Sequence, residues 1–273
     1  MRYIKMSLTL LLLLAFFSNG SLLLASEHTV KEELSREFAF EPGGCLVLDN
    51  PVGEIKVIGW DEPRAEIFAV KKVRYEDDPD YARERLEKIN IKIDKSGNTI
   101  RIKTRFPGGH DANDIFSLST LLKFPRTAKD KKLVGVSYTI KLPRRTDLRV
   151  EQAVGGLAVN GIESDIRADI SVGEISLIDI NGEINAETGV GEVLLKRISG
   201  PADVSVGVGG VTLSLAPDAE VDIRASCGMG DIDCTFPVSV KGKFLGKSLR
   251  GKINGGGPRI CLEAGVGGVS IKH

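Results

Sequence analysis

Residues capable of acid–base or metal chemistry are few in this chain, and they lie far apart. The three histidines are His28, His110 and His273, and none has a partner at a metal-ligand or catalytic spacing. No Walker loop, nucleophile elbow or dinucleotide-binding motif occurs. We therefore predict no catalytic, cofactor-binding or metal-binding residue, and we expect that the protein is not an enzyme.

Carboxylates recur in a pattern. Four of them follow the glycine of a repeated motif: Glu54, Glu174, Glu192 and Asp231. Stacked copies of the motif would align them into an acidic ladder for a cation or a basic surface, or into a solvated edge that discourages strand pairing. Glycine takes the equivalent place at Gly156, Gly210 and Gly268, which favours the solvated edge.

Trp60 is the only tryptophan and stands between Gly59 and Asp61. It is a candidate platform for stacking a sugar. The sequence favours a second role, in which the ring covers one end of the apolar core.

Four cysteines occur: Cys45, Cys227, Cys234 and Cys261. They allow three full pairings, and no pair has the Cys-x-x-Cys spacing of zinc or redox sites. An exported protein permits disulfides. The sequence leaves the disulfide state open, with unpaired and buried thiols favoured.

The repeated motif has a period of 18 residues. Its glycines are Gly155, Gly173, Gly191 and Gly209. Aliphatic residues keep the same frame at Leu157, Ile175, Val193 and Val211, and at Val159, Leu177, Leu195 and Leu213. Related segments occur at 52–57, 229–234 and 266–271. Apolar and polar residues alternate within each unit, which predicts two short strands per unit. Such a unit buries its apolar side only when copies stack.

Two architectures fit this repeat. In a β-solenoid each unit is one coil, and equal positions lie over one another about 4.8 Å apart in parallel strands. In an antiparallel meander each unit is a hairpin with Asn181-Gly182 as a type I′ turn. Recurrence of like residues at each position favours the solenoid. The motif glycine is expected to serve a bend with positive φ or a close backbone approach.

The predicted fold class is therefore all-β: a β-solenoid or β-helix-like stack of about 18-residue two-strand coils, with one short α-helix near 79–89. Asp78-Pro79 supplies the N-cap and first turn of that helix. We expect a signal peptide at 1–25, a β-rich part at 26–104, an irregular loop at 105–133 and repeats at 134–273, the last continuous with 26–104. The basic stretch 239–254 lacks periodicity and is expected to be irregular.

The N-terminus has the order of a secretory signal, with Arg2 and Lys5 before an apolar run and small residues after it. We expect export to the periplasm, the extracellular space or the cell surface, and a mature form that does not span the membrane. The formal net charge is +0, so no electrostatic case for nucleic acid exists.

The order of several segments resembles a known family. The sequence contains NPVGEIKVIGWDEPRAEIFAVKK, then a short helix, then VSYTIKLPRRTDLRVEQAVGGLAVNGI, then 18-residue Gly-x-Ile-x-Val units. This resembles the bacterial DUF4097 family of "putative adhesins" over most of 30–273. The resemblance implies an exported β-solenoid-like protein of the cell envelope and supplies no catalytic residues.

The leading hypothesis is a non-enzymatic, exported β-repeat protein that binds an envelope protein or a glycan. A polysaccharide-acting β-helix enzyme is the first alternative, and three or more carboxylates within about 5–10 Å in one groove would favour it. A structural element that assembles through its open ends is the second.

Overall fold

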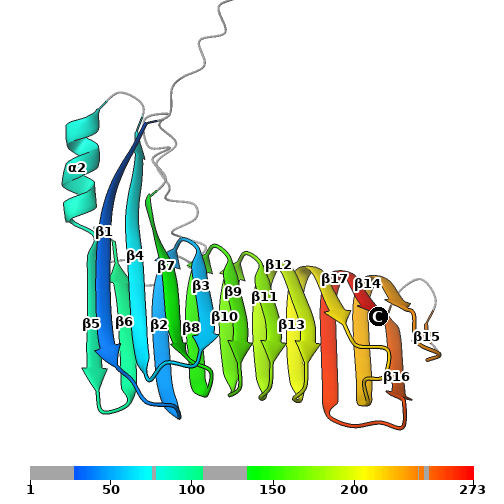
Figure 1. Cartoon of the computed structure of the whole chain (residues 1–273). Coiled ribbons are helices and arrows are strands. Elements are labelled where there is room, and N and C mark those ends of the chain that lie inside the picture. Colours follow the sequence, from blue (N-terminus) through cyan, green and yellow to red (C-terminus); the bar gives the residue numbers. More distant parts are fainter. Residues whose placement is uncertain (1–27, 76–77, 107–133, 239, 243–245) are drawn as a thin grey trace, which may run out of the picture.

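The computed structural model describes residues 28–75, 78–106, 134–238, 240–242 and 246–273. In these residues the fold is mainly β, with 17 strands and one helix. All strands belong to one mixed sheet that curls on itself (Figure 1). The expected signal peptide, His110 and nearly all of the expected loop lie outside the described residues.

The N-terminal elements are β1 (His28–Ala39), β2 (Gly44–Val52), β3 (Ile55–Trp60), β4 (Arg64–Tyr75), α2 (Pro79–Glu87), β5 (Asn90–Ser96), β6 (Thr99–Arg105) and β7 (Val134–Pro143). The next elements are β8 (Thr146–Val154), β9 (Leu157–Ile162), β10 (Ile166–Val172), β11 (Ile175–Ile180), β12 (Ile184–Ile198) and β13 (Ala202–Ser214). The last are β14 (Val221–Cys234), β15 (Val240–Lys241), β16 (Lys247–Ile253) and β17 (Arg259–Lys272).

Strands β8 to β13 pair in parallel at a register of 18 residues. Ile166 pairs with Ile184, and Ile175 pairs with Val193. The predicted vertical alignment of like residues is therefore confirmed. The meander is wrong for this region, because β11 and β12, on either side of Asn181-Gly182, run parallel to each other.

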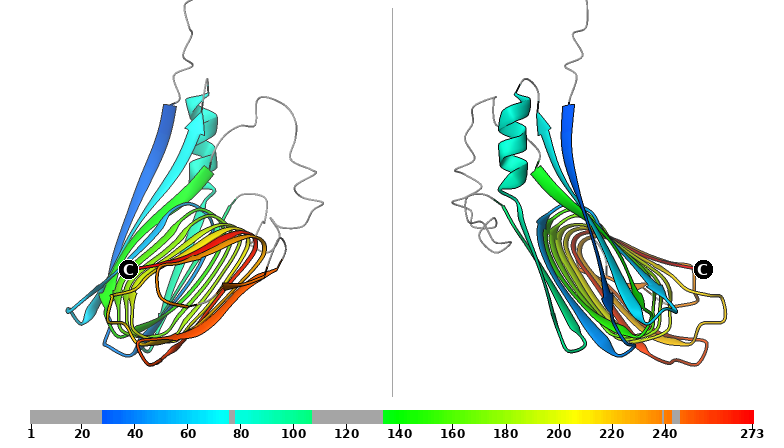
Figure 2. Two further views of the ribbon diagram at one scale, coloured as in Figure 1. Left: turned by 90° about the vertical axis from the view of Figure 1, so that its right-hand side faces the viewer. Right: turned by 60° about the vertical axis from the view of Figure 1, so that its left-hand side comes forward.

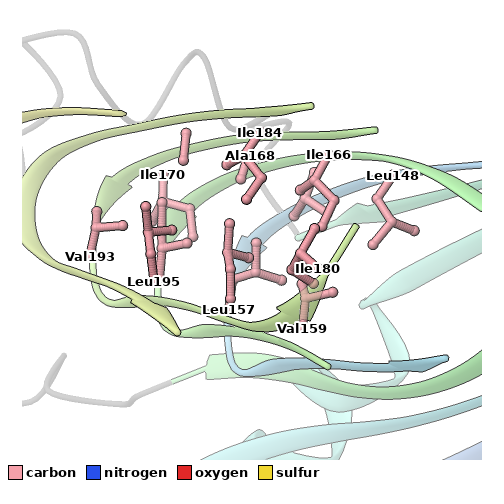
Figure 3. Packing of buried hydrophobic residues seen from close by; sticks show 14 of the residues in the cluster. Leu148, Leu157, Val159, Ile166, Ala168, Ile170, Ile180, Ile184, Val193 and Leu195 are labelled. Carbon is pink, nitrogen blue, oxygen red and sulfur yellow. The ribbon is translucent and has the colours of Figure 1, made fainter. Parts of the chain in front are cut away.

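The aliphatic columns fill the space inside the curled sheet. Ile175 and Val193 are each 1% exposed, and Leu177 and Leu195 are fully buried. Figure 3 shows the labelled side chains packing inward from both walls, with Ile166 and Ile184 facing Leu157 and Val159 across the interior. One hydrophobic cluster runs from the N-terminal strands through the repeats.

The motif glycines lie at the sharp bend between the two walls. Gly173 and Gly191 have φ of +152° and +154°. A Cβ on Gly191 would lie 1.7 Å from the carbonyl oxygen of Gly173 in the preceding repeat. Only glycine permits both the backbone conformation and this approach, so its predicted structural role is confirmed.

Chain order and spatial order differ at both ends of the stack. Strands β2 and β3 lie between the β6–β7 and β8–β9 pairs. At the other end, β17 lies between β13 and β14 (Figure 1). A segment remote in sequence therefore completes the stack at each end.

Antiparallel strands extend the stack at both ends. Strands β1, β4 and β7 form an antiparallel extension, and β5 and β6 form a hairpin around Gly97. Strand β16 pairs antiparallel with β14, so the expectation of an irregular 239–254 stretch is wrong over β16. Figure 2 shows the curled sheet end-on as a flattened ring, with the extension rising beyond it.

The predicted helix near 79–89 is confirmed as α2, which ends at Glu87. The side chain of Asp78 caps its first turn by accepting a hydrogen bond from the backbone N–H of Tyr81 at 2.9 Å. Ala82 and Leu86 are buried against β4 and β1.

A polar pair is buried where β7 meets the core. The hydroxyls of Tyr138 and Thr104 lie 2.6 Å apart. Tyr138 is 2% exposed, and burial raises its pKa to about 12. Loss of this proton would leave a phenolate in an apolar interior, so Tyr138 stays neutral in the folded state.

Replacing Gly191 by alanine should lower the free energy of unfolding by about 2–5 kcal/mol, because the new Cβ meets a backbone oxygen at an unfavourable φ. Urea denaturation measures this. Gly210→Ala is the matched control, since its Cβ would meet Gly268 O at 3.5 Å and its φ is not positive. Equal stability of the two variants would contradict the assignment.

Stability should fall as the pH rises from about 10 to about 12. Below pH 10 Tyr138 is protonated in both the folded and the unfolded protein. Between pH 10 and pH 12 the unfolded protein loses this proton while the folded protein keeps most of it, which lowers the free energy of unfolding by about 2–3 kcal/mol. Denaturation at stepwise pH measures the slope. Tyr138→Phe should be less stable at pH 8 and should lack this part of the alkaline loss. An unchanged slope in the variant would refute the assignment.

Candidate functional site

The outer face of β8, β10 and β12 carries rows of charged side chains. Arg149 pairs in register with Arg167, and Glu151 pairs with Asp169 on the same strands. All four are exposed. Each row runs across the strands, because equal positions of successive repeats pair in parallel register.

These rows surround an open hollow of about 540 Å³. Its charged lining consists of Asp147, Arg149, Glu151, Asp165, Arg167, Asp169 and Glu183. Five carboxylates and two guanidinium groups therefore face one concave surface, which gives it an excess of negative charge.

Part of this charge serves the local turns. Asp165 accepts a hydrogen bond from the backbone N–H of Glu183 at 2.9 Å, and Asp147 accepts one from the hydroxyl of Ser164.

The other charges are open to a ligand. Within the described part of the chain, the side chains of Arg149, Arg167, Glu151 and Asp169 make no hydrogen bond or ion pair. Arginine donors arranged this way suit bidentate binding of carboxylate or phosphate groups.

A second hollow of about 540 Å³ lies on the same wall, toward the C-terminal end of the stack. Arg224, Lys241, Arg250 and Glu263 supply its charges, together with the sulfur of Cys261. Three cations face one carboxylate here. The wall therefore changes sign along its length, from acidic over β8 to β12 to basic over β14 to β17.

The enzyme alternative requires three or more carboxylates in one groove, and the first hollow has five in its lining. Glu151 and Asp169 are paired on neighbouring strands, whose backbones lie about 4.8 Å apart, so two carboxylates stand side by side. Both are exposed and lie beside the Arg149–Arg167 row, in an open hollow that does not exclude water. In the part of the chain that is described, no three His, Cys, Asp or Glu side chains could hold a metal ion.

The motif carboxylates lie at the bend instead, outside both hollows. Glu192 is next to Gly210 across the strand pair, and Asp231 is next to Gly268. Asp231 is also held in an ion pair by Lys247. The ladder is thus interrupted, as the glycines predict.

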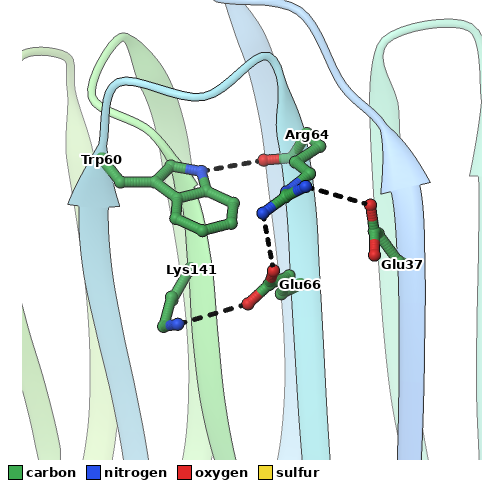
Figure 4. A network of polar contacts seen from close by, with 5 residues as sticks. All are labelled: Glu37, Trp60, Arg64, Glu66 and Lys141. Carbon is green, nitrogen blue, oxygen red and sulfur yellow. Dashed lines mark hydrogen bonds and ion pairs between the residues drawn. The ribbon is translucent and has the colours of Figure 1, made fainter.

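Trp60 belongs to a polar network on β3, β4 and β7 (Figure 4). Its indole N–H donates to the carbonyl of Arg64 at 2.9 Å. The Arg64 guanidinium lies 4.9 Å and the Lys141 ammonium 5.3 Å from the ring centroid. Glu66 bridges these two cations, and Glu37 contacts Arg64.

This network decides between the two roles considered for Trp60. The ring is half-buried on the outer side and lies outside the hydrophobic cluster, so the predicted core-covering role is wrong. Because two cations already contact the indole, a sugar would have to displace them in order to stack there.

The two described histidines lie in separate places. His28 begins β1, where its ring lies 5.5 Å from that of Tyr75. His273 shares a 2.9 Å hydrogen bond with the hydroxyl of Thr235 and packs edge-on against Phe236. The structure does not bring these histidines together.

The four cysteines are free thiols. Cys227 is buried, and its sulfur donates to the carbonyl of Gly267 at 3.2 Å. The other three are half-buried. Burial raises the pKa of Cys45, against the opposing influence of Arg149. No helix in the described residues has the length and apolar character needed to cross a bilayer.

The rows of Arg149, Arg167, Glu151 and Asp169 were missed by the sequence analysis, which followed the glycine and aliphatic positions of the repeat. A signal was present, since these residues recur at 18-residue spacing. Their significance depends on the parallel register, which brings them side by side.

Among known proteins, matches to this chain were found only in the comparison with solved structures. No protein-family model matches the chain, and no curated protein is similar to it. The DUF4097 resemblance therefore stays a prediction.

A "putative cell adhesion protein" from Clostridium sporogenes is 21% identical, with a TM-score of 0.48, covering 88% of this chain and 99% of that one. A "putative adhesin" from Bacteroides fragilis is 14% identical, with a TM-score of 0.43, covering 88% and 96%. A third, from Parabacteroides merdae, is 8% identical with a TM-score of 0.19, covering 89% and 96%. We base no assignment on likeness at this level.

Thiol titration should find four reactive cysteines in the unfolded protein without added reductant, because none is paired. In the native protein Cys227 should react more slowly than the others, since its sulfur is buried. Mass spectrometry after alkylation identifies each site. Fewer than four labelled thiols in the unfolded chain would show a disulfide.

Proposed function

We propose that this chain is an exported, non-enzymatic protein of the cell envelope that binds another envelope component, in the manner expected of DUF4097-like adhesins. In this proposal the coils act as a rigid β-solenoid, and its charged wall is the binding surface. The 18-residue parallel register supports the solenoid interpretation, since equal positions repeat on every coil.

One observation carries the proposal. Arg149 and Arg167 form a row of exposed guanidinium groups beside the row of Glu151 and Asp169, in an open hollow. Mixed charges on a stiff surface give specificity and steer a charged partner. An acidic glycan, or a protein surface with matching charges, fits this face.

Binding to isolated envelope material tests the proposal. The purified mature chain should co-sediment with envelope fractions, and Arg149→Ala/Arg167→Ala should weaken that binding at least tenfold, because two charge-assisted contacts are lost. Lys56→Ala/Lys196→Ala is the matched control, with the same charge change on exposed residues of the opposite wall. Equal loss in both variants would point to non-specific charge attraction.

The enzyme alternative is favoured by a single observation, the adjacent carboxylates Glu151 and Asp169. We expect no hydrolysis when the wild-type protein is incubated with envelope polysaccharides and reducing ends are assayed. Turnover that is lost in Glu151→Gln/Asp169→Asn would replace the binding proposal with the enzymatic one.

A further inference from the structure

Most of the exposed large hydrophobic residues of the described chain share one position of the repeat. This position directly precedes the motif glycine. Its exposed members are Val154, Val172, Val190, Val208, Val266 and Met229, with exposed fractions between 36% and 53%. Val52, which is half-buried, occupies the same position at the N-terminal end.

Strand pairing joins these residues into one continuous column, which we call the valine ladder. Its order is Val52, Val154, Val172, Val190, Val208, Val266 and Met229. At about 4.8 Å per step, seven members span about 29 Å. The insertion of β17 between β13 and β14 keeps the column unbroken near its C-terminal end.

The ladder adds little to the core. Its side chains point outward at the bend, whereas the neighbouring positions on each wall supply the buried columns. Beside the C-terminal members of the ladder, the preceding position is an exposed glycine at Gly189, Gly207, Gly265 and Gly228, so the surface there has low relief. A continuous exposed aliphatic column of this kind is typical of an interaction surface.

Acidic residues lie on both sides of the ladder, interrupted by Gly156, Gly210 and Gly268 on one side and by Ser205 and Ser226 on the other. On one side lie Glu54, Glu174, Glu192 and Asp231; on the other lie Glu151, Asp169, Glu187 and Glu263. Of these eight exposed residues, Asp231 is ion-paired, to Lys247. Arg149 and Arg167 lie beyond the second acidic row, two residues further from the ladder.

These charges select the kind of partner. A second copy of the chain would bring acidic rows against acidic rows in a face-to-face pair, because both flanks carry the same sign. An anionic lipid surface would be repelled in the same way. A partner with an apolar centre and basic flanks matches both the aliphatic column and the acidic residues beside it.

The spacing of the ladder side chains indicates the secondary structure of the partner. Apolar side chains on one face of an α-helix recur about every 5.4 Å, close to the 4.8 Å step of the ladder. Alternate side chains of an extended strand recur about every 6.6–6.8 Å, which matches less well. At 1.5 Å per residue, a helix of about 19 residues spans the ladder.

We propose that the valine ladder is the docking surface for a basic amphipathic helix of a partner protein. The apolar stripe of that helix packs along the valines, and its Lys and Arg side chains reach the carboxylates on both flanks. This surface shares the Glu151–Asp169 row with the charged wall described above, but it does not use Arg149 or Arg167.

A synthetic helical peptide of about 20 residues tests the proposal, with leucines along one stripe and lysines on both sides. Titration calorimetry should show binding to the mature protein that weakens as the salt concentration rises. Val190→Lys/Val208→Lys should weaken binding at least tenfold, by interrupting the apolar column with positive charge. Glu174→Gln/Glu192→Gln should weaken it severalfold and reduce the salt dependence.

Two controls keep this test specific. Ile58→Thr/Ile178→Thr removes apolar surface from the outer side of the opposite wall and should leave peptide binding unchanged. A peptide with glutamates in place of the lysines should not bind. Arg149→Ala/Arg167→Ala should also retain peptide binding, so that failure of the proposed envelope binding and failure of this inference are distinguishable.

Several outcomes would overturn the inference. They are no binding by the wild-type protein, equal binding of the glutamate peptide, or equal affinity in the ladder variants. Sedimentation velocity and anionic vesicle binding complete the test. A dimer that Val190→Lys/Val208→Lys dissociates would assign the ladder to a second copy of the chain, and vesicle binding lost in the same variant would assign it to a lipid surface.

Discussion

The close approach of one backbone to the next at the motif glycines is the constraint on which the structure depends. Gly155, Gly173, Gly191 and Gly209 each have positive φ, and their carbonyls lie where a Cβ of the next repeat would be. Every repeat can therefore turn at the same place and pair with its neighbour at the spacing of a β-ladder. The parallel register, the aliphatic columns and the surface rows all follow from that shared bend.

The 18-residue repeat aligns side chains into rows both inside and outside the curled sheet. Ile175 and Val193 share a buried column because their strands are in register, and the same register places Arg149 beside Arg167 on the outside. A single side chain of this kind has little consequence on a surface. Aligned copies create a charged wall and an apolar ridge, both long enough to meet an extended partner surface.

Antiparallel strands at both ends of the stack terminate the array of repeats. A regular coil leaves strand edges open at both ends, and open edges promote association with other chains. Here β1, β4 and β7 extend one end as antiparallel strands, while β16 lies against β14 at the other. Strand β1 is mostly exposed and carries five charged residues among its twelve, which discourages further pairing at that edge.

The sequence by itself determined the 18-residue period, the bend glycines and the short helix with its Asp78 cap. Those features are local or periodic, and a pattern of residue types specifies them directly. The predicted pair of short strands per repeat holds for β8 to β11, whereas β12, β13, β14 and β17 each run through the bend as one strand. Only the tertiary structure decided that β17 enters between β13 and β14, that Trp60 lies outside the core, and that charged rows and valines form continuous surfaces. These depend on which strand edges meet, and contacts between segments remote in the chain leave no periodic trace in the sequence.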